Sequence, residues 1–161
     1  MKKLTALALL FMTVFTFSCS SDDDDNVTPP ISDEIYIRAK VNGVQKNFID
    51  PESITSLNTL IRGYSGNGNT FQALSLWMPN NVTVGSHAIA MSNGSDVTIY
   101  SASYNETFDL EAEGSTGQIT VISITDDYIT GTFSFTGEAS DGTVYNVTEG
   151  EFRAYNSFTD F

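Results

Sequence analysis

Histidine and cysteine, residue types that often bind metals or act as nucleophile and base, each occur once in this chain, as His87 and Cys19. A metal site built on two histidines and a disulfide within the chain are therefore both excluded. Ser86 precedes His87, but adjacent residues of a strand point to opposite faces, whereas a nucleophile and its base must lie within hydrogen-bond reach. The segment also lacks the spacing of a nucleophile elbow. We expect His87 to be solvated or to cap a turn.

Acidic residues are the next candidates for chemistry. Glu111 and Glu113 are two residues apart and would share one face of a strand, and carboxylates about 5–9 Å apart can serve a glycosidase. Neighbouring acids are common on exposed strand faces, so we expect a solvated face. Asp126-Asp127 and Asp141-Gly142 lack the alternating oxygen ligands of a calcium loop and are expected to form turns. The sequence therefore predicts no catalytic residue, no metal and no cofactor, and a protein that is not an enzyme.

Aromatic residues give the best indication of a binding surface. Six fall on predicted strands, and several of these lie opposite the face expected to be buried: Trp77, Tyr36, Tyr64, Tyr100, Tyr104 and Tyr128. Exposed rings could stack on sugars or anchor a protein partner. If both faces of the strands are covered, the same rings serve as packing, because large aromatic side chains are mostly buried. The first five are our candidate ligand contacts.

Alternation of apolar and polar residues predicts the fold. In residues 34–41, Ile35, Ile37, Ala39 and Val41 would share one face, and Asn42-Gly43 then gives a strong hairpin signal. We also expect one helical turn at 50–52 and a turn of the chain at 114–117. Further strands are expected at 44–49, 59–64, 71–78, 82–90, 97–104, 108–112, 118–125, 128–136, 143–148 and 151–155. No sustained helical periodicity is present. The pattern predicts an all-β domain, an antiparallel β-sandwich or a partly closed barrel of about ten short strands.

The first 18 residues have the layout of a secretory signal peptide. Lys2 and Lys3 form a basic start, an apolar run extends from Leu4 to Phe17, and the small Ser18 precedes Cys19. The apolar run is too short to span a membrane, which takes about 20 residues. We therefore expect residues 1–18 to be removed on export.

The segment after the signal peptide is predicted to contain a lipid anchor and a tether for the domain. Ser18 and Cys19 resemble the last two positions of the lipobox of bacterial lipoproteins, which implies that Cys19 carries lipid. Ser20, Ser21, Asp22, Asp23, Asp24 and Asp25 resemble the serine-plus-acidic export signal of Bacteroidota surface lipoproteins. These resemblances imply a lipid-anchored protein of the outer membrane that faces the cell exterior. Residues 19–32 end in a proline-containing linker, and residues 33–161 form the single β domain.

Charge limits the partners. The net charge of −13 repels phosphate backbones and anionic headgroups, so nucleic acid is not an expected partner. Aromatic residues make up 12% of the chain, which is too many for a disordered protein. The expected membrane association is through the lipid anchor alone.

The C-terminal part carries a family resemblance. Gly117-Gln118-Ile119-Thr120-Val121, the run from Ile129 to Phe135, Gly142 and Val147-Thr148-Glu149-Gly150-Glu151-Phe152 resemble the signature of an uncharacterised Bacteroidota lipoprotein family, known as a domain of unknown function. Val41-Asn42-Gly43 and Gly85-Ser86-His87 also fit the family, and the resemblance extends over about residues 34–155. The shared motifs are glycine turns and phenylalanine core positions, so the resemblance implies a fold and no catalytic residues.

Two functions remain open from the sequence. One is a non-enzymatic binding or accessory module at the cell surface, with a glycan or a surface protein as its partner. The alternative is a carrier that holds a small apolar ligand inside a lipocalin-like barrel. Accessibility of the aromatic residues and the space inside the barrel distinguish the two.

Overall fold

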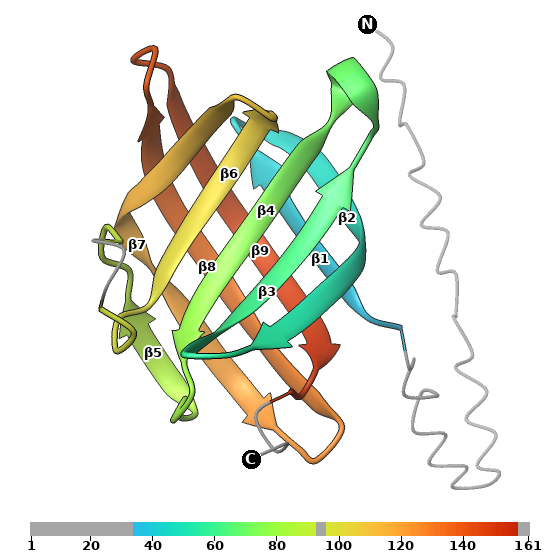
Figure 1. Ribbon diagram of the computed structural model, residues 1–161, viewed down its shortest axis with the longest axis vertical. Helices are drawn as coiled ribbons and strands as arrows, with labels where there is room; N and C mark the ends of the chain where they lie inside the picture. Colours follow the sequence, from blue (N-terminus) through green and yellow to red (C-terminus); the bar gives the residue numbers. More distant parts are fainter. Residues whose placement is uncertain (1–33, 93–95, 158–161) are drawn as a thin grey trace, which may run out of the picture. The chain divides into compact units, whose positions relative to one another are not determined.

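Antiparallel strands make up most of the domain. The computed structural model describes residues 34–92 and 96–157, within the unit Asp33–Phe161 (Figure 1). The elements in chain order are β1 (Tyr36–Val41), β2 (Val44–Thr55), β3 (Asn58–Ser65), the 3-10 turn η1 (Gly68–Thr70), β4 (Gln72–Pro79), β5 (Gly85–Ala88), β6 (Ser101–Thr107), β7 (Leu110–Ile124), β8 (Tyr128–Ala139) and β9 (Val144–Tyr155). The predicted signal peptide, Cys19, the acidic export signal and the tether lie outside the described residues. None of the helical segments in 34–92 and 96–157 is long and apolar enough to cross a membrane.

Eight strands close into a barrel. Their order around the wall is β7-β6-β4-β3-β2-β1-β9-β8, and β8 pairs with β7 to complete the circle (Figure 1). The neighbouring strands all pair in antiparallel fashion. β5 lies outside this circle in the strand order and pairs with β7 beyond the segment that β6 occupies. The predicted all-β antiparallel fold is confirmed, and the barrel is the architecture that forms.

Side chains fill the interior of the barrel. Burial alternates along the strands as the pleat requires, most regularly in β8, where every second residue from Ile129 to Ala139 is buried. Phe48 and Tyr104 meet edge to face, with ring centroids 6.4 Å apart, and Tyr104 also contacts Tyr145 at 5.1 Å. These rings are almost completely inaccessible to solvent. The wall therefore encloses a packed core.

Two glycine–phenylalanine pairs fix the contact between β8 and β9. Gly131 lies opposite Phe152, and Phe133 lies opposite Gly150. A Cβ atom built on Gly131 would lie 2.6 Å from Cε1 of Phe152, and one on Gly150 would lie 2.5 Å from Cε2 of Phe133. Each phenylalanine ring thus covers a glycine of the neighbouring strand, a recognised way of stabilising a glycine within a sheet.

Two local predictions are wrong. Residues 50–52 do not form a helical turn, because β2 continues through them and Pro51 lies at a bulge between Ile49 and Glu52, where a strand tolerates proline. Residues 114–117 do not reverse the chain. β7 continues through them with a register shift after Gly114, and Gly117 has φ of 138°, a conformation that favours glycine. The chain bends here because β7 must change its neighbour from β6 to β5.

The hairpin between β1 and β2 forms as the sequence predicts. Asn42 and Gly43 have φ angles of 48° and 81°, which is the left-handed pair that a tight hairpin turn needs. The side-chain amide of Asn42 also donates to the carbonyl of Val144, and its Oδ1 accepts from the N–H of Asn146 at 2.8 Å. This turn is therefore tied to β9 as well as to its own strands.

Candidate functional site

Four adjacent strands, β3, β4, β6 and β7, bring polar and aromatic side chains together on the outer wall. Ile61, Leu76, Ala102 and Ala112 of these strands point into the core, so the residues between them point outward. Outward residues that pair across neighbouring strands form rows. The first row contains Leu60, Trp77 and Ser101; the second contains Arg62, Ser75, Ser103 and Glu113; the third contains Tyr64, Ala73, Asn105 and Glu111.

A trough runs over the small residues in the middle of these rows. Ser75, Ser101 and Ser103 are short and lie between larger side chains on β3, β4 and β7. A hollow of about 240 Å³ lies beside Trp77 and is lined by Ser101, Ser103, Glu111 and Glu113 among others. The volume is below the ~300 Å³ of the smallest enclosed ligand pockets, so the hollow suits one ring of a longer ligand lying across the surface. We call this hollow the Trp77 trough.

Trp77 also borders a second hollow. This second hollow has a volume of about 320 Å³ and is lined by Leu57, Val97 and Ile99 in addition to Trp77 and Ser101. The indole is half-buried, and its N–H donates no hydrogen bond to the described residues. Trp77 therefore forms a wall shared by two adjoining hollows and offers both a ring face and a free donor.

The two glutamates of β7 face the same trough. Glu111 and Glu113 are exposed, and within the described part of the chain neither carboxylate has a hydrogen-bond or ion-pair partner. Glu138 on β8 lies directly opposite Glu113, and it is exposed too. Like charges opposite each other destabilise a sheet. The arrangement gives the trough strong acceptors at some cost in stability.

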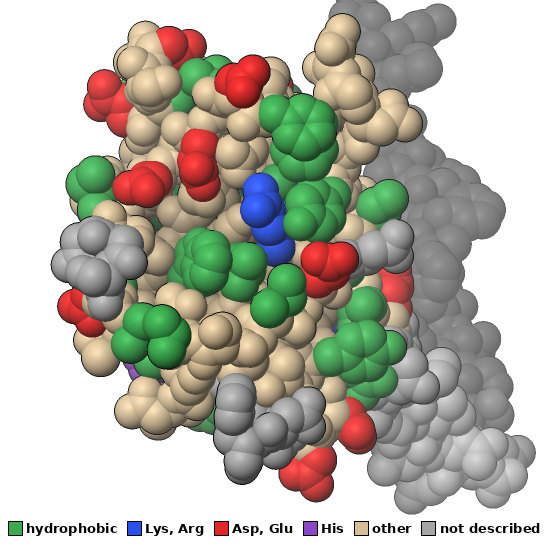
Figure 2. All heavy atoms as spheres, viewed as in Figure 1, with side chains coloured by type: hydrophobic (Ala, Val, Ile, Leu, Met, Phe, Trp, Pro, Cys, Tyr) green, Lys and Arg blue, Asp and Glu red, His purple; other side chains and the backbone are tan. Residues whose placement is uncertain are grey.

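Stacked aromatic rings continue the surface beyond the trough. Phe71 and Phe108 stack with centroids 3.9 Å apart, Tyr64 contacts Phe71 at 5.9 Å, and Phe108 is 67% exposed. The guanidinium carbon of Arg62 lies 5.3 Å from the centre of the Tyr64 ring. Figure 2 shows the result, with hydrophobic side chains spread over the face of β3, β4 and β6, a basic patch among them and acidic side chains around them.

Three buried polar atoms of this surface lack hydrogen bonds. They are Nε of Arg62, Oγ of Ser103 and Oδ1 of Asn105. Ser103 is 4% exposed and Asn105 is 6% exposed, although both point to the outer side of β6. Buried polar groups are normally paired, and each that is not costs about 1–3 kcal/mol. These three atoms therefore retain hydrogen-bonding capacity beneath an exposed aromatic surface.

The other predicted ligand-contact residues, Tyr36, Tyr100 and Tyr104, are not part of the surface that contains Trp77 and Tyr64. Tyr104 is fully buried in the core, so the prediction that it belongs to an exposed face is wrong; the strand register turns it inward beside Ala102. Tyr100 stacks on His87, with centroids 4.0 Å apart, and burial raises its pKa. Tyr36 lies on β1, opposite Arg153 of β9, and the Arg38 guanidinium covers its ring at 4.6 Å.

His87 and Ser86 separate as expected for neighbours on a strand. Nε2 of His87 lies 2.8 Å from the carbonyl oxygen of Thr83, and the ring stacks on Tyr100. The hydroxyl of Ser86 instead donates to Oε1 of Gln118 and accepts from Thr120, both at 3.1 Å. The two side chains make no contact with each other in these bonds, and His87 serves to fasten β5 and the segment before it.

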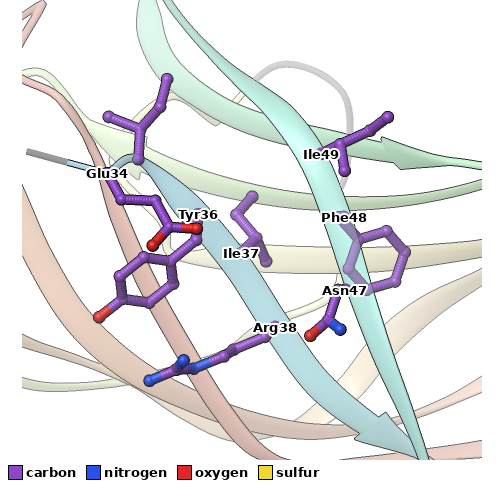
Figure 3. Close-up of a pocket in the computed structure, with 8 residues that line it drawn as sticks. Glu34, Tyr36, Ile37, Arg38, Asn47, Phe48 and Ile49 are labelled. Atoms are coloured by element: carbon purple, nitrogen blue, oxygen red, sulfur yellow. The ribbon is translucent and has the colours of Figure 1, made fainter.

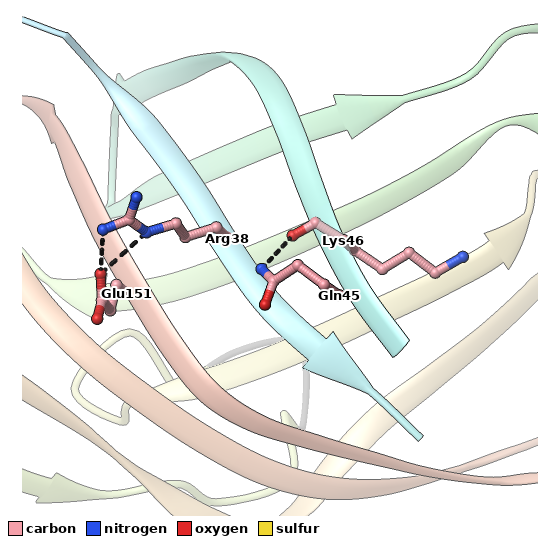
Figure 4. Close-up of polar contacts among 4 residues, drawn as sticks. All are labelled: Arg38, Gln45, Lys46 and Glu151. Carbon is pink, nitrogen blue, oxygen red and sulfur yellow. Dashed lines mark hydrogen bonds and ion pairs between the residues drawn. The ribbon is translucent and has the colours of Figure 1, made fainter. Parts of the chain in front are cut away.

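A larger hollow of about 610 Å³ lies where β1 and β2 part. The pairing of the two strands ends at Ile37 and Phe48, and β2 then bends toward β3. Figure 3 shows Tyr36 and Arg38 extending from β1 beside this gap. Arg38 is already occupied, since it donates to Glu151 at 2.6 and 2.9 Å (Figure 4), and this hydrogen bond raises its pKa. The hollow therefore offers fewer unpaired groups than the Trp77 trough.

Sequence reasoning found Trp77, Tyr64, Glu111 and Glu113 but did not connect them. Their proximity depends on β6 lying between β4 and β7, a strand order that no local pattern reveals. Arg62 was missed, because a lone arginine on an amphipathic strand has the pattern of an ordinary solvated residue. The closed barrel defines the class as a β-barrel domain with a filled interior and a hollow on its outer wall.

The chain belongs to the DUF6252 family, a domain of unknown function, whose family model matches residues 53–155. The match runs from within β2 to the end of β9 and so includes every row residue of the trough. The predicted membership of a family of unknown function is confirmed over these residues. No curated protein and no solved structure is detectably similar to the chain.

Proposed function

We propose that the barrel is a non-enzymatic binding module that holds a glycan in the Trp77 trough. The observation that carries this proposal is the hollow itself. The indole of Trp77, the buried Ser103 with its unpaired Oγ, and two carboxylates that have no partner among the described residues converge there. Asn105, whose Oδ1 is also unpaired, lies on β6 opposite Glu111. A sugar ring presents an apolar face to stack on an aromatic ring and hydroxyl groups that donate to carboxylate and amide oxygens. Both needs are met within a single hollow.

The arrangement favours binding over hydrolysis. In a glycosidase two carboxyl groups flank the scissile bond. Glu111 and Glu113 instead project from the same face of one strand, so both would lie along one side of a ligand in the trough. Their chemistry here is to accept hydrogen bonds from hydroxyl groups.

The position of the module follows from the N-terminal segment. We propose that residues 1–18 are cleaved, that Cys19 receives the lipid, and that Ser20 to Asp25 direct the protein to the exterior of the outer membrane of a Bacteroidota cell. Residues 26–32 would then hold the barrel away from the lipid surface. A binding module in this place meets extracellular polysaccharide before enzymes or transporters do.

The carrier alternative has less support. An internal ligand needs space inside the barrel, whereas a Cβ atom at Gly63 would already lie 2.6 Å from Cβ of Phe48 and 3.3 Å from Cδ1 of Ile37. Phe48, Tyr104 and Tyr145 contact one another across the interior. An apolar ligand would have to displace side chains that are packed at native density.

Trp77 is the only tryptophan, so its fluorescence reports directly on the proposed site. The full chain in detergent is titrated with a panel of neutral and acidic oligosaccharides, and a bound sugar is expected to shift or quench the emission. Trp77→Ala is expected to weaken retention in polysaccharide-affinity electrophoresis at least tenfold. The matched control is Tyr155→Ala, which removes an exposed aromatic ring of β9. Retention that is equal for both variants would overturn the proposal.

A further inference from the structure

We propose that the glycan in the Trp77 trough carries a carboxylate, and that Arg62 binds it. The ligand class is a uronic acid flanked by neutral sugars. This inference rests on the proposed function and adds the chemical identity of the ligand to it.

Arg62 has no anionic partner among the residues that the structure describes. It is the only lysine or arginine on the four strands of the site. On the neighbouring wall Arg38 is paired with Glu151 and Lys40 with Glu149, at 2.6 and 2.7 Å. Arg62 makes no such bond with the described residues, although Glu52 lies opposite it on β2, and its Nε is buried. A planar guanidinium matches a carboxylate with two parallel hydrogen bonds.

The charges around Arg62 limit the number of anionic groups that the ligand can carry. Glu113 is in the same row as Arg62, separated from it by Ser75 and Ser103. Three strand spacings of about 4.8 Å place the two Cα atoms roughly 14 Å apart. One carboxylate can therefore lie against Arg62 while neutral rings extend toward Glu113 and Glu111. A densely charged polyuronate would place further carboxylates against these glutamates and be repelled.

Movement of Arg62 toward a ligand would also expose the unpaired atoms. Ser75 and Ser103, its neighbours in the row, are 3% and 4% exposed although both are small and point outward, so longer side chains must extend over them. Trp77 and Arg62 are the long side chains beside them. The Arg62 guanidinium has no hydrogen bond to the described part of the chain, so it can turn toward a carboxylate. Sugar hydroxyls then reach Oγ of Ser103 and Oδ1 of Asn105.

The test compares sugars that differ in one group. A uronate-containing oligosaccharide, its carboxyl-reduced counterpart, a polyuronate and a sulfated oligosaccharide are titrated into the full chain, with Trp77 emission and calorimetry as readouts. We expect the mixed uronate to bind at least tenfold more tightly than its reduced form, because a hydrogen bond to a charged group contributes about 1.5–3 kcal/mol. The polyuronate and the sulfated sugar should bind more weakly than the mixed uronate.

Variants then assign the preference to Arg62. Arg62→Gln should remove the tenfold difference and leave binding of the reduced sugar within about twofold, whereas Arg62→Lys should retain part of it. Arg38→Gln removes the same charge from β1 and should leave the difference unchanged. Equal binding of the uronate and its reduced form to the wild type, or tighter binding of the sulfated or fully charged sugar, would overturn the inference and leave the proposed function standing. No response to any sugar would overturn both.

Discussion

Replacing Gly131 by alanine tests the account of the β8–β9 core. The added Cβ would lie 2.6 Å from Cε1 and 2.7 Å from Cζ of Phe152, and it would press on the carbonyl oxygen of Thr120. The obstructing atoms belong to β9 and β7, the two strands on either side of β8. No single side-chain rotation relieves both contacts, so the strands themselves must shift.

The expected cost is large for a single methyl group. Overpacking a filled core costs about 1–3 kcal/mol, and two opposed contacts place Gly131→Ala near the upper value, about 3 kcal/mol. Gly142→Ala is the matched control, because a Cβ there meets nothing within 4 Å and only the positive φ of 84° opposes it. That conformation costs about 1 kcal/mol for alanine. The two substitutions thus separate crowding from backbone strain.

Urea unfolding followed by Trp77 emission measures both free energies of unfolding. A domain of this size is stable by about 5–15 kcal/mol, so both variants should remain folded in the absence of urea. Phe152→Leu removes the two crowding ring carbons, and combining it with Gly131→Ala should cost about 1 kcal/mol less than the sum of the single changes. If Gly131→Ala costs no more than Gly142→Ala, or if the two core changes are additive, the interdigitated packing described here is incorrect.

Three further outcomes follow from other parts of the barrel. Burial raises the pKa of Tyr104, which also donates a hydrogen bond to Glu106. The folded state therefore favours the neutral phenol, and this contribution to stability is present below a pH of about 10 and is lost as the pH rises. Absorbance at alkaline pH should show a phenol that ionises only on unfolding. The N–H of Thr143 donates to Asp141 at 2.9 Å and lowers the pKa of that carboxyl. The stabilisation from this hydrogen bond is present above the pKa of Asp141 in the unfolded chain, and it is lost as the pH falls through the lower pKa of the folded state. The Thr143 amide resonance should therefore titrate below the ordinary aspartate range, and Asp141→Asn should abolish the titration. Glu113→Gln should raise the free energy of unfolding by about 0.5 kcal/mol by removing repulsion from Glu138, while weakening retention on the glycan; unchanged stability would mean that the opposed charges do not interact.

Local sequence patterns predict the strands of this domain well but not their order. Alternation identifies β1, β3, β4 and β8, and Asn42-Gly43 identifies the first hairpin, because these signals depend on neighbours along the chain. The glycines at 114 and 117 have the composition of a turn, yet the chain continues through them as β7. Pairing with β8 stabilises the extended conformation there, and that pairing is a tertiary effect.

The candidate site is also only partly predictable, because its residues come from strands whose order the local sequence does not reveal. The sequence identifies aromatic and acidic residues on outward faces, but alternation alone cannot say which outward faces adjoin. Tyr104 shows the limit, since a register different by one residue reverses the face of every side chain in its strand. Arg62 shows another, because its proposed role depends on its having no ion-pair partner among the described residues, which is visible only when the neighbouring strands are in place.

A filled barrel has a consequence for where a ligand can bind. Because Phe48, Tyr104 and Tyr145 occupy the interior, the proposed glycan site is on the outer wall, where strand pairing sets the spacing of side chains and small residues set the depth. β6 contributes to that depth, because Ser101 is shorter than Trp77 beside it on β4, and Ser103 is shorter than Glu113 beside it on β7. Enlarging one of them should therefore block the trough without disturbing the core. We expect Ser103→Leu to weaken glycan retention at least tenfold, as Trp77→Ala does, while core residues keep their burial. Ser103→Leu with undiminished binding would show that the ligand does not lie over β6.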